Sequence, residues 1–151
     1  MSVSHYDWLK EYQEMDHDCK YLEWSIQKSE NEYKRWQIGG DLSNIKLSPE
    51  SHAAHLEDDI KQMKSELEWR RDAMAELLRL VKSFEGIDEV ILRKKYIEGM
   101  TLEEIADDQD VHYALSYIRK KHAELRRRIE WLDRWDETKY EDLANQPELL
   151  V

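Results

Sequence analysis

The stretch that decides the fold is residues 88–128, DEVILRKKYIEGMTLEEIADDQDVHYALSYIRKKHAELRRR. Its apolar positions and turn residues predict three helices, at residues 88–98, at residues 102–107 and at residues 112–132. Only a short turn separates the last two helices. That is the helix-turn-helix arrangement, which presents its last helix to the major groove of DNA.

Local signals support these boundaries. Gly99 follows the first helix, where a residue without a Cβ adopts a positive φ without strain. Thr101 and Glu104 have the spacing of a capping box, in which a hydroxyl and a carboxylate bind free backbone N–H groups at the start of a helix. The segment Asp108-Gln109-Asp110-Val111 is expected to make the turn, because Asp tolerates left-handed backbone geometry, and Val111 is expected to fill the corner.

The third helix has two different faces. Its inward positions fall at spacings of three and four, and they are Leu115, Ile118, His122, Leu125, Ile129 and Leu132. The outward face is basic, aromatic and hydroxyl-bearing, as expected of a helix that contacts bases and phosphates. The candidate DNA-binding residues are Tyr113, Ser116, Tyr117, Arg119, Lys120, Lys121, Arg127 and Arg128. The alternative is an ordinary solvated face, with some arginines paired to Glu124 or Glu130.

A family resemblance lies in residues 96–125, YIEGMTLEEIADDQDVHYALSYIRKKHAEL. The matching residues are Tyr96, Gly99, Thr101, Glu104-Ile105-Ala106, Val111, Ser116-Tyr117-Ile118 and His122. This segment resembles the sigma factor region 4-like helix-turn-helix domain of small phage transcription regulators of the RinA and ArpU type. The resemblance implies an activator of late phage genes in the cytoplasm of the bacterial host cell. The turn departs from the family pattern, since it lacks the usual glycine and has Gln109 where leucine is common, which implies a looser turn.

The charge of the chain is unevenly distributed. The whole chain has 23 Lys and Arg residues against 34 Asp and Glu residues, a formal net charge of −11. Residues 112–134 are positive, with seven basic and three acidic residues. A local basic stripe favours phosphate contact, while acidic surroundings weaken non-specific binding. We therefore expect modest and strongly salt-dependent affinity for double-stranded DNA.

Two long amphipathic helices are predicted before the helix-turn-helix. Mostly large or apolar residues recur at alternating spacings of three and four over residues 5–36 and again over residues 53–84. The predicted seam positions are His5, Trp8, Tyr12, Met15, Cys19, Leu22, Ile26, Ser29, Tyr33 and Trp36 in the first helix, and Ala53, Leu56, Ile60, Met63, Leu67, Arg70, Met74, Leu77, Val81 and Phe84 in the second. Two glycines make residues 37–47 a predicted loop, and Ser48 and Pro49 are typical of a helix start. The two helices are expected to fold back on each other as an antiparallel coiled-coil hairpin.

The predicted fold class is therefore all-α. Glycine and proline are scarce (four and two) and 38% of residues are charged, which favours long helices. We expect a coiled-coil hairpin at residues 1–86, a helix-turn-helix DNA-binding domain at residues 87–134 and an acidic tail at residues 135–151. For the tail, a short docking helix and a disordered segment both remain open.

The hairpin is the predicted protein-contact surface. Two helices cover each apolar seam on one side only, and an exposed apolar stripe normally marks an interface. We expect a homodimer through the hairpin, with RNA polymerase or another phage or host protein as a further candidate partner. Two other functions remain open. One is a phage terminase small subunit that binds packaging-site DNA, and the other is an interaction factor that acts on RNA polymerase or a repressor.

The sequence gives no sign of an enzyme, a cofactor or a metal site. It has no glycine-rich phosphate loop and no nucleophile elbow, and its six histidines and Cys19 lack metal-ligand spacing. A single cysteine fits a reducing cytosol. No apolar run approaches the roughly 18 residues that a membrane span needs, and the N-terminus lacks a secretory signal pattern. We expect a cytoplasmic protein that is not an enzyme.

Overall fold

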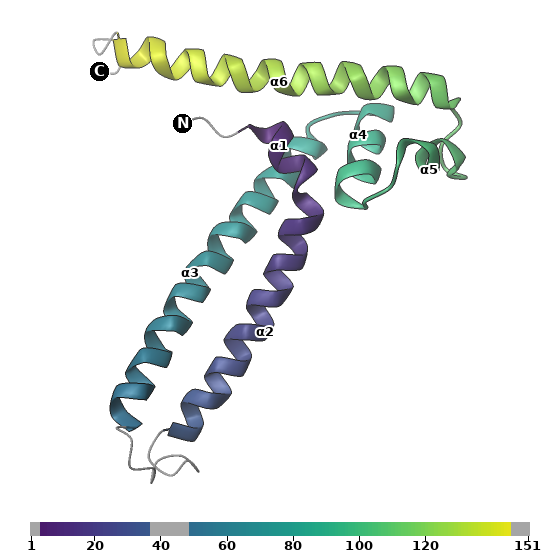
Figure 1. The fold of residues 1–151 in the computed structure, drawn as a ribbon. Coiled ribbons are helices and arrows are strands. Elements are labelled where there is room, and N and C mark those ends of the chain that lie inside the picture. The colour runs from purple at the N-terminus through teal and green to yellow at the C-terminus, as the bar shows by residue number, and fades with distance from the viewer. Residues whose placement is uncertain (1–3, 37–48, 146–151) are drawn as a thin grey trace. The chain divides into compact units, whose positions relative to one another are not determined.

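The computed structural model describes residues 4–36 and 49–145, and it describes the side chains of residues 4–36 and 53–136. Within these ranges the chain is helical with short turns and contains no strand, which confirms the all-α prediction (Figure 1). None of the described helices combines the length and the apolar character needed to cross a membrane. The predicted loop at residues 37–47 and the Ser48 cap lie outside the described residues.

The chain divides into two compact units. One consists of Met1–Gln13 together with Glu76–Val151, and we call it the C-terminal unit; the other, Glu14–Ala75, we call the helix-pair unit. This division differs from the expected ranges 1–86 and 87–134. The reason is that the start of the chain and the residues just after position 75 contribute their apolar side chains to the core of the C-terminal unit.

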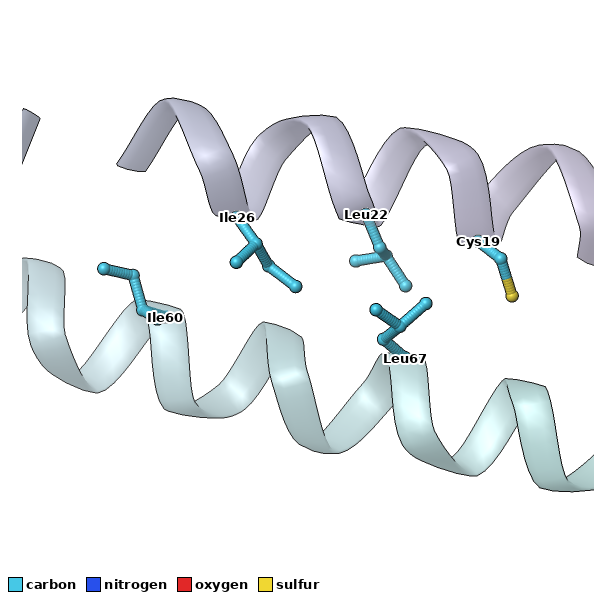
Figure 2. Close-up of a cluster of buried hydrophobic side chains, with 5 residues drawn as sticks. All are labelled: Cys19, Leu22, Ile26, Ile60 and Leu67. Atoms are coloured by element: carbon cyan, nitrogen blue, oxygen red, sulfur yellow. The ribbon is translucent and has the colours of Figure 1, made fainter. Parts of the chain in front are cut away.

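The helix-pair unit contains most of α2 (Tyr12–Trp36) and α3 (Pro49–Lys82). The two helices run in opposite directions. Asp18 pairs with Arg70 at 3.1 Å near one end, and Glu30 pairs with Lys64 at 2.9 Å further along. An apolar cluster of Cys19, Leu22, Ile26, Ile60 and Leu67 lies between the two helices (Figure 2). These side chains remain 5–9% exposed, because each helix has only one neighbour in this unit.

Most predicted seam positions of this pair are confirmed. The buried residues on α2 are Tyr12, Met15, Cys19, Leu22 and Ile26, and those on α3 include Leu56, Ile60, Leu67, Leu77 and Val81. The period of three and four residues therefore identified the faces of both helices correctly from Tyr12 onward.

Before Tyr12, the predicted unbroken helix is wrong. Helix α1 (His5–Lys10) ends at Glu11, whose φ of −94° and ψ of 0° interrupt the helical path before α2 begins. The break changes which side chains are buried: Tyr6 and Leu9 are buried, not the expected His5 and Trp8. Tyr6 and Leu9 join the core of the C-terminal unit, where α1 packs against α6.

The C-terminal unit also contains α4 (Ile87–Leu92), the π-helix η1 (Arg93–Ile97), α5 (Leu102–Asp107) and α6 (Leu115–Asn145). The predicted helix at residues 88–98 is thus an α-helix that continues into a π-helical turn. Gly99 has a φ of +78°, as predicted. The most deeply buried side chains come from α1, α3, α4, α5 and α6: Leu9, Leu77, Val81, Ile91, Leu92, Ile105, Ile118, Leu125 and Ile129.

Helix α6 differs from the prediction at both ends. It begins at Leu115, not at residue 112, and it continues without a break to Asn145. The segment expected to be a separate tail is therefore helical as far as residue 145, and the residues after it lie outside the described ranges. Leu132, expected on the inward face, is 38% exposed, because the inward stripe of α6 is covered only as far as Ile129 and Asp133.

His5 ties α1 to two other parts of the unit. Its Nδ1 lies 2.6 Å from Asp133 Oδ1 on α6, and its Nε2 lies 3.1 Å from Glu76 Oε1 on α3. A neutral imidazole has one N–H group, so both contacts are hydrogen bonds only when His5 is protonated. Burial lowers the pKa of His5, but the hydrogen bonds and negative charges of Asp133 and Glu76 outweigh burial, and the net pKa is raised.

This arrangement predicts a pH-dependent contribution to stability. The folded pKa of His5 is raised above the unfolded value of about 6.5, so the contribution is complete below that pH and is lost as pH rises through the folded pKa. In urea unfolding, His5→Gln should lower the free energy of unfolding more at pH 6 than at pH 9. His17→Gln, at an exposed position of α2, is the control. Equal losses at both pH values for His5→Gln would contradict this role.

Candidate nucleic-acid interface

Helix α5 is positioned by its cap and by one buried side chain. Thr101 precedes the helix with extended backbone geometry, and its hydroxyl oxygen accepts a hydrogen bond from the Glu104 backbone N–H at 3.1 Å. The hydroxyl half of the predicted capping box is thereby confirmed. Ile105 is fully buried where α5 packs against α6. The cap and this contact set the direction of α5 relative to α6.

The turn between α5 and α6 is closed by Asp108. Its Oδ1 accepts a hydrogen bond from the Asp110 N–H at 2.9 Å, and its backbone oxygen accepts one from the Val111 N–H at 3.0 Å. Val111 is buried, as predicted. Asp108 has a φ of −66°, and among the described residues only Gly86 and Gly99 have a positive φ. The turn therefore closes through hydrogen bonds and not through the left-handed residue that we expected.

Lys94 anchors this turn from beneath. It is a buried charged residue of η1, and its Nζ lies 3.1 Å from Asp108 Oδ2. The backbone hydrogen bond from Asp110 and the hydrogen bond from Lys94 together lower the pKa of Asp108, which keeps the carboxylate ionised. Sequence reasoning missed this role, because Lys94 stands in a run of three basic residues that looks like a solvated face.

A second polar contact holds α6 against η1 and α1. The Tyr96 hydroxyl and His122 Nε2 are 2.6 Å apart, and the Tyr96 hydroxyl also donates to the Tyr6 hydroxyl at 3.4 Å. Burial, followed by the positive charges of Lys95 and Arg126, lowers the pKa of His122. Burial also raises the pKa of Tyr96. The contact is therefore made by neutral groups, and it fixes the rotation of α6 about its axis.

That rotation leaves part of the predicted binding face open. Ser116, Lys120 and Arg127 are exposed and lie on the side of α6 opposite Ile118 and Leu125. Lys120 and Arg127 form no ion pair with any other residue in the described part of the chain. The three side chains follow one line over about 16 Å of helix, at ~1.5 Å per residue.

The two candidate tyrosines lie together at the start of this line. The rings of Tyr113 and Tyr117 stack at 4.6 Å with an angle of 19° between their planes. Tyr113 is 46% exposed and stands just before α6 rather than inside its first turn. The stack gives the N-terminal end of the helix a flat aromatic edge next to Ser116.

The other three candidates lie on the flanks and contact acidic residues. Arg119 donates to Glu103 at 2.8 Å, and this hydrogen bond lowers the pKa of Glu103. Lys121 and Arg128 lie 3.8 Å and 3.5 Å from the carboxylate oxygens of Asp88. Ion pairs at exposed positions contribute little to stability. The basic flanks are thus partly neutralised by acidic residues, which a phosphate group can replace as the binding partner.

The interface also has neighbours that sequence reasoning did not single out. Trp131 and Trp135 are exposed on α6 beyond the predicted residues. The sequence signal that could have identified them is that the two tryptophans are four residues apart and lie outside the predicted inward stripe.

Among the residues described, no group of three His, Cys, Asp or Glu side chains is arranged to hold a metal ion. Comparisons with protein-family models, curated proteins and solved structures found no match to this chain.

The Lys94–Asp108 contact predicts a measurable effect on stability. Lys94→Met keeps the buried aliphatic stem but removes the charge and the hydrogen bond to Asp108. Loss of a hydrogen bond to a charged group at a buried site costs about 1–3 kcal/mol, so the free energy of unfolding should fall by that amount. Lys82→Met, at an exposed position near the end of α3, is the matched control in the same urea titration. Equal stability of the two variants would show that Lys94 does not support the turn.

Proposed function

We propose that this protein is a sequence-specific DNA-binding transcription regulator. In this proposal α5, the Asp108 turn and α6 form a sigma factor region 4-like helix-turn-helix, and the N-terminal half of α6 enters the major groove. The observation that carries the proposal is the uncovered face of Tyr113, Ser116 and Lys120. It lies on the basic segment of an otherwise acidic chain.

The chemistry of this face suits base contact. An α-helix fits the major groove, which is about 12 Å wide. A lysine ammonium group recognises guanine O6 and N7, serine hydroxyls bind several base edges, and apolar side chains contact the thymine methyl group. Lys120, Ser116 and the stacked tyrosines supply these groups within two turns of helix. They are the proposed base-reading residues.

The flanking cations are suited to phosphate contact. Arg119, Lys121 and Arg128 extend from both sides of α6, and Arg127 lies further along the exposed line. Phosphate contacts fix the position of a protein on the duplex without selecting sequence. Because Asp88 and Glu103 compete with DNA for three of these cations, binding should weaken steeply as salt rises.

The helix pair α2–α3 is the proposed contact surface for a protein. A groove of about 680 Å³ runs along it, with Ile26 and Leu67 at its base and charged residues at its rim. A second copy of the chain or RNA polymerase is the candidate occupant. By its resemblance to RinA- and ArpU-type regulators, the protein would activate late phage genes in the cytoplasm of the bacterial host.

The test is a selection of bound fragments from random DNA, followed by titrations of the selected site at several salt concentrations. Lys120→Ala and Arg127→Ala are compared with the wild type. Lys61→Ala, an exposed lysine on α3, is the control. Loss of a phosphate contact should weaken all sequences evenly and reduce the salt slope by about 1. Loss of a base contact should cost about 1–3 kcal/mol at one base position.

Tyr117→Ala tests the aromatic edge in the same titrations. Binding that is unchanged by both Tyr117→Ala and Lys120→Ala would show that this face does not read DNA.

A second candidate function is favoured by the acidic neighbours of the flanking cations. Since Arg119, Lys121 and Arg128 already contact Glu103 and Asp88, the same fold also suits a factor that binds RNA polymerase or a repressor without touching DNA. The variant Lys120→Glu/Lys121→Glu separates the two functions. If the protein regulates by binding DNA, this variant should lose its regulatory activity. If the protein acts only through contacts with other proteins, the variant should stay active.

A further inference from the structure

Two tryptophans form an exposed aromatic surface in the middle of α6. The rings of Trp131 and Trp135 lie 6.1 Å apart with an angle of 1° between their planes. They are 55% and 53% exposed, and Leu132 beside them is also exposed. A shallow groove of about 570 Å³ adjoins Trp131 and is lined by Glu124, Arg127, Arg128, Trp131 and Leu132. We call Trp131, Leu132 and Trp135 the tryptophan face.

The tryptophan face is not needed for the core of its own unit. The buried stripe of α6 consists of Ile118, Leu125 and Ile129, and Trp131 and Trp135 lie outside that stripe. Large aromatic side chains contribute most when they are buried against a surface, and a contiguous exposed apolar patch on a soluble protein marks an interaction site. The face is therefore available to an occupant from outside this unit.

The charge along α6 indicates what that occupant is. Residues 115–134 have seven basic and three acidic residues, whereas residues 135–145 have four acidic residues and one basic residue. The helix is thus basic before the tryptophan face and acidic after it. An antiparallel copy of the same helix places each basic half beside an acidic half, which is the complementarity expected of an isologous contact.

The spacing of individual residues agrees with this arrangement. Arg128 stands seven residues before Trp135, and residue 142, an aspartate, stands seven residues after it. Positions seven apart lie along the same stripe of an α-helix. In an antiparallel pair that crosses at Trp135, position 128 of each copy is therefore opposite position 142 of the other.

We propose that the tryptophan face is a self-association surface, on which α6 of a second copy of this chain packs in the antiparallel direction with its crossing point near Trp135. The contact is distinct from a dimer through α2 and α3, because it uses side chains of α6. It does not rest on DNA binding. Position 120 lies about 22 Å from the crossing point, at ~1.5 Å per residue, so the face of Ser116 and Lys120 remains accessible.

The size of the surface sets the expected affinity. A tryptophan buries about 150–250 Å² when it is fully covered, so four half-exposed rings supply about a third or less of the ~1,600 Å² of a standard interface. The rest comes from Leu132 and the flanking charged side chains. We expect a dimer with a dissociation constant on the order of micromolar, weakened by salt because part of the contact is between opposite charges.

Sedimentation of the full chain from about 1 to about 100 µM, a range that spans this affinity, tests the proposal. The wild type should shift from monomer to dimer across that range. Trp131→Ala/Trp135→Ala should raise the dissociation constant at least about tenfold, as expected when central aromatic residues are removed. Trp24→Ala is the matched control, because Trp24 is 57% exposed on α2. It should leave the dimer unchanged. Circular dichroism confirms that each variant is folded.

A charge exchange tests the direction of the pairing. Arg128→Asp alone and Asp142→Arg alone should each weaken the dimer, and the double variant Arg128→Asp/Asp142→Arg should restore it. Failure of the double variant to restore the dimer overturns the antiparallel arrangement. A dimer lost with Trp24→Ala but kept with Trp131→Ala/Trp135→Ala places self-association on the helix pair and overturns the proposal. A wild type that remains monomeric throughout overturns it too. Quenching of the wild-type tryptophan fluorescence by DNA that is lost in Trp131→Ala/Trp135→Ala would then assign the face to nucleic acid.

Discussion

The burial of a single apolar stripe along α6 is the constraint on which the rest of the C-terminal unit depends. Ile118, Leu125 and Ile129 retain at most 1% of their surface to solvent. The preceding elements contribute equally buried partners: Leu9 from α1, Leu77 from α3, Ile91 from α4 and Ile105 from α5. Because an α-helix repeats every 3.6 residues, directing this stripe inward necessarily directs the opposite side of α6 to solvent. The outward orientation of Ser116, Lys120 and Arg127 is therefore a consequence of how the core is packed. No additional contact is needed to keep these three side chains exposed to a ligand.

Apolar packing alone leaves helices able to slide and rotate, and polar contacts restrict both movements here. The Tyr96–His122 hydrogen bond sets the rotation of α6, the Lys94–Asp108 pair sets the turn before it, and His5 joins α1 to Asp133 and Glu76. Each contact joins elements that are distant in sequence. A buried charge or hydroxyl group without its partner is costly, so these contacts disfavour other packings of the same apolar surfaces. The exposed acidic neighbours act differently, because the ion pair of Arg119 with Glu103 contributes little to stability yet lowers the local positive charge that a phosphate would meet.

Features that depend on neighbouring residues could be predicted from the sequence. The bounds of α5, the positive φ of Gly99, the Thr101 cap and the seams of α2 and α3 all follow from local spacing and backbone chemistry. Features that depend on distant residues could not. The break at Glu11 occurs because Tyr6 and Leu9 are buried in the C-terminal unit, which the heptad pattern of residues 5–36 does not reveal. The exposed face of α6 was found from its period, but its ionic neighbours were not, since Asp88 and Glu103 precede their partners by more than a dozen residues. Lys94 looked like the solvated residues on either side of it.

The C-terminal unit is assembled from two stretches of chain separated by residues 14–75, and this has a consequence for how the molecule folds. Joining such distant segments carries an entropic cost of loop closure that grows with the length of the intervening chain. Helices α2 and α3 reduce that cost, because their antiparallel association brings the two ends of the intervening segment together, as the 3.1 Å contact between Asp18 and Arg70 records. Once α2 and α3 have paired, the effective loop between α1 and the end of α3 is short. We therefore expect α2 and α3 to pair first, so that assembly proceeds from the middle of the polypeptide outward to its termini.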